Sequence, residues 1–507
     1  MLSLDPNHSV AAPANEKVGL MLMRAHRPLG RSARTAARSG APVLAALLMS
    51  GCILQKDLPD PALDIPAAYK ESRSRSIDQP PALDWWRSFG SAELTTLMEE
   101  AQTVNLDIAA ATARILQADA QARIIGAALL PFVSASGDAS RARSSGSNSG
   151  SGIGSGREFS NFSAALSASY EIDFWGKNRD AALSAEELSN ATRFDRDVVA
   201  LTTLTAVANA YFQVLTAQDR IRIATNNIAS AQRVYDAIKQ RLDVGTGTDL
   251  DLAQQESVLA GQKALVPPLR QILAQNVNIL ATLVSRPPER VTVSGGSLRR
   301  LASPRVTPGL PSELLIQRPD IRRSEAQLAS TTADVGNARA QFFPSIQLTG
   351  SGGYQSAALA SLFTPQTAFF NLAVGATQPI FDAGRIQSNF DLQKARQDEA
   401  LQIYRRSVVS AFADVDNALV ALRQTSERLR LQAEVLSASR RAFDLAEQRL
   451  RAGTADIITV LNTQLTLFQA EDSLAQIRLS RFLAIVSLYQ ALGGGWSRGE
   501  VRTVNAL

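Results

Sequence analysis

Cysteine and histidine are almost missing from this chain of 507 residues. The one cysteine is Cys52, and both histidines, His8 and His26, precede it. No internal disulfide can therefore form. A mature chain that begins at Cys52 also lacks the side chains used by histidine general bases, by Cys–His or Ser–His nucleophiles and by most zinc or copper sites. We expect a protein that is not an enzyme and that needs no cofactor or metal.

Proline is missing from two long spans, between Pro131 and Pro267 and after Pro379. Residues 177–243 lack glycine as well. Because an interior proline breaks a helix, these residues can form one helix of about 100 Å at about 1.5 Å per residue. Residues 385–452 likewise contain neither proline nor glycine. Helices of this length are typical of coiled coils or tube walls and not of ordinary globular domains.

A positive charge excess is also missing from most of the chain. The net charge is +5, but the excess comes largely from the first 51 residues. The rest of the chain carries 46 basic and 45 acidic residues, so it has no signature of a polyanion-binding protein. Six basic residues account for the local excess: Lys17, Arg24, Arg27, Arg31, Arg34 and Arg38.

The N-terminal segment has the pattern of a signal peptide. A basic stretch precedes the apolar run 41–49, which is too short to span a bilayer as a mature helix. Cys52 follows Ser50 and Gly51, and this order resembles a bacterial lipoprotein cleavage site. We therefore predict that residues 1–51 are removed and that Cys52 is lipidated, with palmitate among the acyl chains. A plain secretory signal with a chance cysteine is the alternative, and Met1, Met21 and Met23 stay open as the start of translation.

Two segments of the chain repeat each other. The stretch "IKQRLDVGTGTDLDLAQQ" and the later "EQRLRAGTADIITVLNTQ" place Gly245 and Gly453 208 residues apart. Gly176 and Gly384, which directly precede the two predicted long helices, keep the same offset. We infer an internal duplication, with a long helix pair in each half and a turn at Gly245 and at Gly453, where glycine supplies a positive φ.

The long segments also share a heptad-like rhythm, which predicts coiled-coil packing. We assign this apolar seam to the core and to no binding role. In the second half it consists of Val408, Phe412, Val415, Leu419, Leu422 and Leu429, and in the first half of Ala200, Leu204, Val207, Tyr211, Val214 and Ile221.

Strands are predicted just before each long helix. Apolar and polar residues alternate over 162–174 and over 370–380, and each run has a partner upstream, after Pro131 and after Pro344. Exposed loops are expected at 141–160 and 355–368. Four strands are too few to close a barrel, which takes about eight. Open edges are not tolerated in lipid, so strands that span a membrane require several chains in one barrel.

Four stretches carry a resemblance to a known family, and with the helix pairs they cover nearly all of the mature chain. They are "WWRSFGSAELTTLMEEAQTVNLDIAAATARILQADAQARIIGAALLP", "AVANAYFQVLTAQDR", "QRPDIRRSEAQLASTTADVGNARAQFFPSIQLTGSGGYQS" and "QPIFDAGR". The chain resembles the TolC-type outer-membrane efflux proteins, in particular the lipoprotein branch (NodT-like and OprM-like proteins) that serves resistance-nodulation-division pumps. The resemblance implies a mainly α fold with a β-barrel part: a homotrimer whose long helices form a periplasmic tunnel below a twelve-stranded outer-membrane barrel.

The resemblance also implies the partners and the division of the chain. The partners are a periplasmic adaptor protein, an inner-membrane pump and outer-membrane lipid, and no nucleic acid is expected. The division is a signal peptide at 1–51, a lipidated segment of an equatorial region at 52–92, a first repeat at 93–300, a second repeat at 301–492 and an equatorial tail at 493–507.

The turns at Gly245 and Gly453 are expected at the periplasmic tip, which closes the resting channel and docks the adaptor. Asp251 matches an acidic tip position of the family, and Asp249 and Asp456 are near it. Thr459 and Asn462 are neutral where relatives are often acidic, so the usual acidic ring is in question.

We therefore expect closure to depend on apolar packing and ion pairs at the tip. Ile458, with Leu461, is a candidate apolar collar. Arg449 and Arg451 are candidate cations for pairs with Asp251. The alternative for each residue is a solvated tip charge or an ordinary packing contact, and exposed pairs contribute only about 0–1 kcal/mol each.

The function implied is a passive exit duct for small toxic compounds or drugs in a tripartite efflux pump. The duct of a type I protein secretion system is an alternative within transport. A periplasmic coiled-coil lipoprotein without a pore is an alternative of a different class, which the alternating strands disfavour. The pump and the adaptor are expected to select the substrate.

Overall fold

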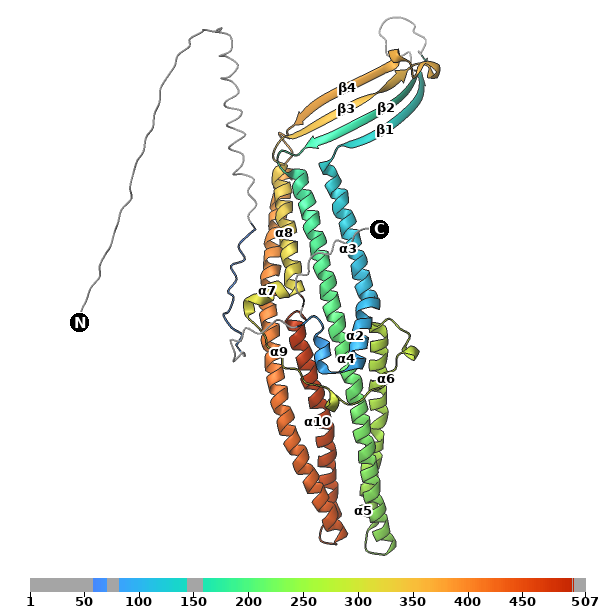
Figure 1. Cartoon of the computed structure of the whole chain (residues 1–507), viewed down its shortest axis with the longest axis vertical. Helices are drawn as coiled ribbons and strands as arrows, with labels where there is room; N and C mark the ends of the chain where they lie inside the picture. Colours follow the sequence, from blue (N-terminus) through green and yellow to red (C-terminus); the bar gives the residue numbers. More distant parts are fainter. Residues whose placement is uncertain (1–57, 71–81, 144–157, 495, 497–507) are drawn as a thin grey trace, which may run out of the picture. The chain divides into compact units, whose positions relative to one another are not determined.

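The computed structural model describes residues 58–70, 82–143, 158–494 and 496. The predicted signal peptide, the predicted lipidation site Cys52 and most of the predicted tail lie outside these residues. The first half of the described chain contains η2 (Trp85–Phe89), α2 (Ala92–Val104), α3 (Leu106–Gly126), β1 (Phe132–Arg143), β2 (Glu158–Ile172), α4 (Lys177–Asp243), α5 (Asp249–Ala264) and α6 (Val266–Leu283). The second half contains α7 (Leu314–Gln317), α8 (Pro319–Ala340), β3 (Ser345–Ser356), β4 (Ala368–Thr377), α9 (Arg385–Arg451) and α10 (Ile457–Ala491) (Figure 1).

The two long helices, α4 and α9, have 67 residues each. Helix α4 covers the predicted span 177–243, and α9 ends at Arg451, one residue before the predicted end. Each begins directly after a glycine with positive φ, Gly176 at 80° and Gly384 at 83°. An aspartate before each glycine accepts hydrogen bonds from the first backbone N–H groups. Asp173 accepts from Arg179 N at 2.8 Å, and Asp382 accepts from Ile386 N at 2.8 Å. The duplicated start signal is therefore a left-handed glycine with an aspartate that caps the helix.

The return helices differ between the halves. In the second half α10 runs for 35 residues without interruption. In the first half the same path is divided between α5 and α6 at Leu265, because Pro267 and Pro268 follow and cannot donate backbone hydrogen bonds. The duplication therefore preserves the hairpin, but the second arm is continuous only in the second half.

The helices nearest the strands form a layer in the order α3, α4, α8, α9. Each helix of this series contacts the next one, so α3 and α9 are its two edges. At the other end of the long helices, α4 packs against α5 and α6, α9 packs against α10, and α10 joins the two hairpins by contacting α4 and α5. Figure 1 shows the two hairpin turns at the end opposite the strands.

By length and composition α4 could cross a bilayer, but 56% of its apolar window is buried inside the protein.

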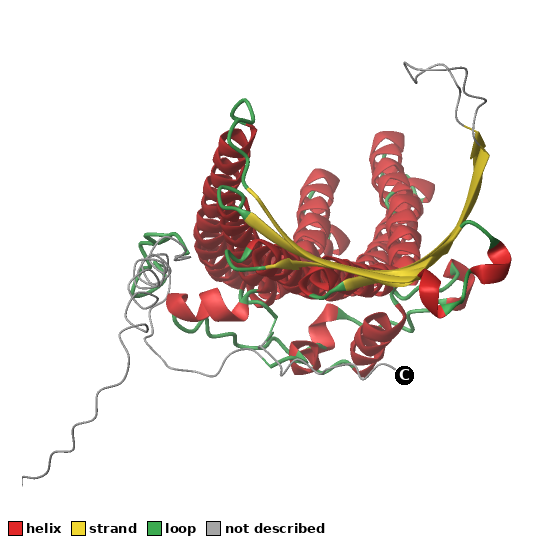
Figure 2. Ribbon diagram, turned by 90° about the horizontal axis from the view of Figure 1, so that it is seen from above, coloured by secondary structure: helices red, strands yellow, loops and turns green. Residues whose placement is uncertain are grey.

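The four strands form one antiparallel sheet in the order β1-β2-β3-β4, which Figure 2 shows as a curved surface. The register places mostly apolar residues on one face and mostly polar residues on the other. The apolar face carries Val133, Ala135, Ala139, Phe162, Ala164, Leu166, Ala168, Tyr170, Ile172, Ile346, Leu348, Tyr354, Phe370, Leu372, Val374 and Ala376. The opposite face carries Ser134, Ser136, Asp138, Ser163, Ser167, Glu171, Gln347, Thr349, Ser351, Gln355 and Asn371.

The predicted strand ends were wrong by a few residues. Phe174 and Ile380 continue the alternation, but β2 ends at Ile172 and β4 ends at Thr377. Phe174 N donates to Ile172 O in a tight turn, and Asp382 turns the chain into α9. The strands also extend into the predicted loop 141–160. Strand β1 continues to Arg143, which pairs with Glu158 of β2.

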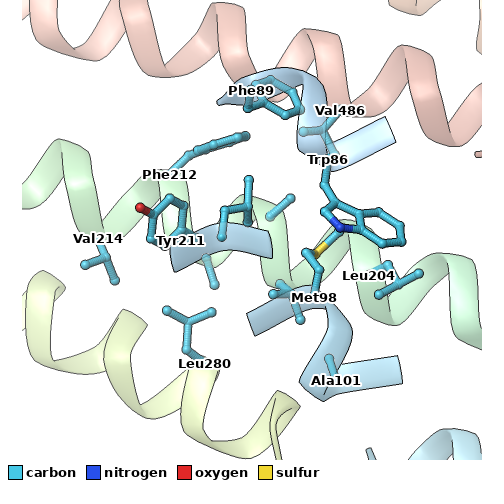
Figure 3. Close-up of a cluster of buried hydrophobic side chains, with 14 of the residues drawn as sticks. Trp86, Phe89, Met98, Ala101, Leu204, Tyr211, Phe212, Val214, Leu280 and Val486 are labelled. Carbon is cyan, nitrogen blue, oxygen red and sulfur yellow. The ribbon is translucent and has the colours of Figure 1, made fainter. Parts of the chain in front are cut away.

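Most large buried side chains lie where the two helical hairpins meet the layer of four helices. Figure 3 shows Phe89 of η2, Phe212 of α4 and Val486 of α10 in this cluster. The rings of Phe89 and Phe212 lie 5.1 Å apart, and Trp85 stacks on Tyr489 at 4.9 Å. The segment before α2 therefore supplies aromatic side chains that join α4 to α10.

The linker between the repeats is attached to this region by a buried carboxylate. Asp219 of α4 accepts hydrogen bonds from Ser297 Oγ at 2.8 Å and from Leu298 N at 3.2 Å, and its other oxygen accepts from Arg222. Ala302 N donates to Phe89 O at 3.0 Å. The linker is thus held along α4 and η2.

The start of α8 is attached by a nearly buried arginine. Arg318 donates to Asp320 at 2.7 and 3.0 Å, to Asp414 of α9 at 3.0 Å and to the carbonyl of Ala491 at 3.1 Å. Burial opposes ionisation of Asp320, but the hydrogen bonds and charge of Arg318 outweigh it and hold the pKa of Asp320 below its usual value.

The Arg318–Asp320 pair predicts a pH-dependent stability. A carboxylate whose pKa is lowered by folding stabilises the fold above its unfolded pKa, and this contribution is lost as the pH falls through the folded pKa. We expect Asp320→Asn to destabilise the protein by about 1–3 kcal/mol near pH 7, since Arg318 loses a charged acceptor. Thermal unfolding of the variant and of the wild type should converge as the pH falls below the folded pKa. The exposed Asp391→Asn on α9 is the control, and an equal deficit for both variants at all pH values would contradict the prediction.

Candidate functional site

The first hairpin turn ends α4 at a left-handed glycine and starts α5 with a capping box. Gly245 has a φ of 79°, and its N–H donates to Leu242 O at 2.9 Å. Thr248 Oγ1 accepts from Asp251 N at 3.2 Å, while the Asp251 carboxylate accepts from Thr248 N at 3.3 Å. Asp251, predicted as an acidic tip residue, is therefore held in place by the start of α5.

The second turn uses a different residue for the same purpose. Gly453 has a φ of 74°, and Asp456 caps α10 by accepting from Thr459 N at 2.8 Å. Hydrogen bonds from Thr459 lower the pKa of Asp456 from its usual value. Asp456 was recognised in the sequence only as a nearby acid. Its place directly before the apolar start of α10 is the signal of an N-cap that the sequence offered.

A cleft of about 250 Å³ lies between the two turns and brings several predicted residues together. Asp251 and Ile458 both line it, with Asp456 and Arg241. Arg241 was missed in the sequence, although it is the counterpart of Arg449 at the repeat offset of 208. The structure thus groups two carboxylates, one arginine and one exposed apolar side chain at the tip.

The other candidate residues lie outside this cleft. Arg451 donates to Glu447 of its own helix at 2.6 Å, and Arg449, Asp249, Thr459 and Asn462 are exposed. Leu461 is 8% exposed and packs in the core between the hairpins, whereas Ile458 is 55% exposed. Of the two residues predicted to form the apolar collar, Ile458 is exposed and Leu461 is buried.

Polar links join the two hairpins above the tip. Arg220 of α4 donates to both oxygens of Asp472 of α10, at 2.6 and 3.0 Å. Nearer the tip, the buried Gln255 of α5 donates to Ala231 O at 2.8 Å and to Gln464 of α10 at 3.3 Å. The two turns are therefore carried by hairpins that are fastened to each other within one chain. In the described residues no group of three or more His, Cys, Asp or Glu side chains could hold a metal ion.

A two-faced sheet with helices that extend about 100 Å below it defines a class of protein, the outer-membrane channel with a periplasmic helical part. A sequence profile described as outer membrane efflux protein matches residues 97–286 and 310–494, and the gap between the matches falls in the linker between the repeats. The chain belongs to the outer membrane efflux protein family.

Individual relatives agree with this assignment. The chain is 39% identical to the pyoverdine export outer membrane protein OpmQ of Pseudomonas aeruginosa, over 90% of this chain and 96% of that protein. It is 30% identical to the cation efflux system protein CusC of Escherichia coli, over 90% and 98%. Among solved structures, the outer-membrane channel OprN matches with a TM-score of 0.82 at 28% identity, over 87% and 98%. The open state of the Neisseria gonorrhoeae MtrE channel matches with a TM-score of 0.78 at 30% identity, over 88% and 99%.

The protein is thus an outer-membrane efflux channel, as predicted from the sequence. Channels of this family work with periplasmic adaptors and inner-membrane pumps in tripartite systems. The protein-secretion duct and the scaffold without a pore, which the sequence left open, are not favoured.

The tip cleft generates a prediction about channel closure. We expect Ile458→Ala and Asp251→Ala each to raise the resting single-channel conductance of the purified protein in planar bilayers. An exposed ion pair of Asp251 would contribute only about 0–1 kcal/mol. The effect of each substitution is nevertheless repeated in every copy of the chain. Because Asp251 also caps α5, Thr248→Ala is the matched control that removes the cap and keeps the charge. If the resting conductance is unchanged in both the Ile458 and the Asp251 variant, the predicted role of the tip cleft in closure is wrong.

Proposed function

We propose that three copies of this chain form a passive exit duct, in which each copy supplies four strands of a twelve-stranded outer-membrane barrel. One observation carries the proposal: the four-stranded sheet has a continuous apolar face, but both of its edges, β1 and β4, are unpaired within the described chain. An unpaired backbone N–H or C=O costs several kcal/mol in hydrocarbon. Pairing of β4 with β1 of the next copy removes both edges.

The helical layer supports the same arrangement. Its two edges, α3 and α9, carry apolar side chains that the described chain leaves exposed. They include Leu116 and Ile124 on α3, and Leu392 and Val409 on α9. Large exposed apolar patches are typical of protein–protein contacts. Contact between α9 of one copy and α3 of the next would cover these side chains and continue the barrel as a tunnel.

The division of the chain proposed from the sequence fits these contacts. Residues 93–300 and 301–492 each contribute a strand pair and a long helix pair to the wall. Residues 52–92, of which η2 packs in the aromatic core, and the linker attached to Asp219 belong to an equatorial region, together with the tail 493–507. We propose that residues 1–51 are removed and that Cys52 is lipidated.

The tip is the surface that we propose for docking and closure. A periplasmic adaptor and a resistance-nodulation-division pump are the partners proposed, and the residues involved in closure are Asp251, Ile458, Arg241 and Asp456. Arg449, Arg451, Asp249, Thr459 and Asn462 remain surface candidates for the adaptor. The duct needs no catalytic group. The 39% identity to a pyoverdine export protein favours secreted small molecules as substrates, selected by the pump and adaptor.

Disulfide trapping at the sheet edges tests the trimer. We expect Asn371→Cys on β4, combined in turn with Ser134→Cys, Ser136→Cys and Ser140→Cys on β1, to give covalent dimers and trimers on denaturing gels for one pairing. Cysteines join only when their Cα atoms lie within about 7 Å.

The control pair is Ser167→Cys with Asn371→Cys. These positions lie on one face, but Ser351 of β3 separates them, so no bridge should form. A monomeric channel in mild detergent, with no crosslink from any pair, would refute the proposal.

A further inference from the structure

The apolar face of the sheet carries charges at one end only. Among its strand residues the charged ones are Arg141 and Arg143 of β1 and Glu158 of β2. All three lie beside the β1–β2 connection, at the end of the sheet farthest from the helices (Figure 1). The remaining strand positions of this face are apolar, glycine or serine. Such a distribution is that of a lipid-facing surface that ends in a basic rim.

The register places this rim just above the apolar band. Ala139 and Phe162 are the last apolar pair, Arg141 lies opposite Ser160, and Arg143 lies opposite Glu158. At about 3.3 Å per residue and a tilt of about 40°, the two arginines lie roughly 5 and 10 Å beyond the apolar edge. This depth is that of lipid headgroups and not of hydrocarbon.

Aromatic side chains mark the same boundary. Phe162, Tyr354 and Phe370 lie on the apolar face near its outer end, and the ring of Tyr354 packs edge-on against Phe363 at 5.4 Å. Phe370 is 84% exposed. Aromatic rings gather at membrane interfaces, since the ring prefers the layer between hydrocarbon and water. The arginines therefore lie on the headgroup side of an aromatic belt.

One acidic residue only partly compensates the two cations. Arg141 donates to Glu158 at 2.7 Å, while Arg143 is 3.9 Å from the other oxygen of the same carboxylate. The side chains of Arg141 and Arg143 stay 75% and 67% exposed. Among the described residues of this rim, each chain thus has one excess positive charge, which the proposed barrel would direct toward the headgroups of the outer leaflet. An arginine presents paired N–H donors that match phosphate oxygens.

We propose that Arg141 and Arg143 form a binding site for the phosphorylated headgroup of an outer-leaflet lipid, and that Glu158 limits its affinity. The inference rests on the proposed function, since it requires the sheet to span the outer membrane as part of a barrel. It gives one expected partner, the outer-membrane lipid, a specific binding site and a chemical class of headgroup. The site would be repeated in each copy and would fix the depth and orientation of the barrel in the membrane.

The test compares lipid retention by the purified full-length channel, measured by native mass spectrometry with phosphorylated lipid A and with its dephosphorylated form. We expect the double variant Arg141→Gln, Arg143→Gln to bind phosphorylated lipid A roughly tenfold more weakly. Dephosphorylated lipid A should bind the wild type and the variant equally weakly. The control is the double variant Arg428→Gln, Arg441→Gln on the exposed surface of α9, which should bind as the wild type does.

Two further variants separate the proposal from a purely structural role. Glu158→Gln should bind phosphorylated lipid A more tightly, because it releases both arginines. Arg141→Lys with Arg143→Lys should retain most of the binding. If Glu158→Gln gains no affinity, the arginines only brace the hairpin and the proposal is wrong. It is also wrong if inorganic phosphate at low concentration displaces the lipid.

Loss of the trimer is a separate outcome. The glutamine variants at Arg141 and Arg143 should keep the crosslinking pattern and conductance of the wild type. A failure of the proposed barrel would instead remove crosslinks and conductance from the wild type itself.

Discussion

The need to pair every backbone group inside hydrocarbon is the constraint on which the rest of this structure depends. The sheet of one chain has four strands and two free edges, so by itself it could not lie in a bilayer. Closure by other copies satisfies the edges, and it also determines what the helices must do. Since β1 continues from α3 and β4 continues into α9, the copies that join at the sheet must also meet at these two helices. One requirement of the backbone thus organises both the barrel and the tunnel.

The duplicated chain meets this requirement with one unit used twice. Each unit begins its long helix at a left-handed glycine that follows a capping aspartate, and ends it at a second left-handed glycine. Equal lengths of α4 and α9 keep the two hairpin turns at one level. The units differ where they do not have to match. The return path of the first unit is interrupted between α5 and α6, before Pro267, and the caps of the return helices are Thr248 and Asp456.

The interior holds the two units together through a small number of concentrated contacts. Aromatic residues are only 6% of the chain, yet several gather in one cluster between η2, α4 and α10. Toward the tip the polar links Arg220–Asp472 and Gln255–Gln464 accompany a second apolar cluster, to which α4, α5, α9 and α10 all contribute. Polar links of this kind depend strongly on geometry, because a partner that moves leaves a buried group unsatisfied. The tip is therefore held by apolar packing together with polar links, and the polar links are the contacts most sensitive to a change in geometry.

The sequence by itself determined the length of the helices, the number of strands, the two faces of the sheet and the turns at Gly245 and Gly453. These features follow from the absence of proline, from periodicity and from glycine, all of which act locally along the chain. The tertiary structure alone decided where β2 and β4 end, that Leu461 is core, and that Arg241 lies beside Asp251 in a cleft. In the sequence, apolar and polar residues alternate through Phe174 and Ile380, beyond the observed ends of β2 and β4. This local pattern does not show where the hydrogen bonds to the neighbouring strand end. A side chain's partner depends on which helix face meets which neighbour, and this is settled only when the hairpins pack.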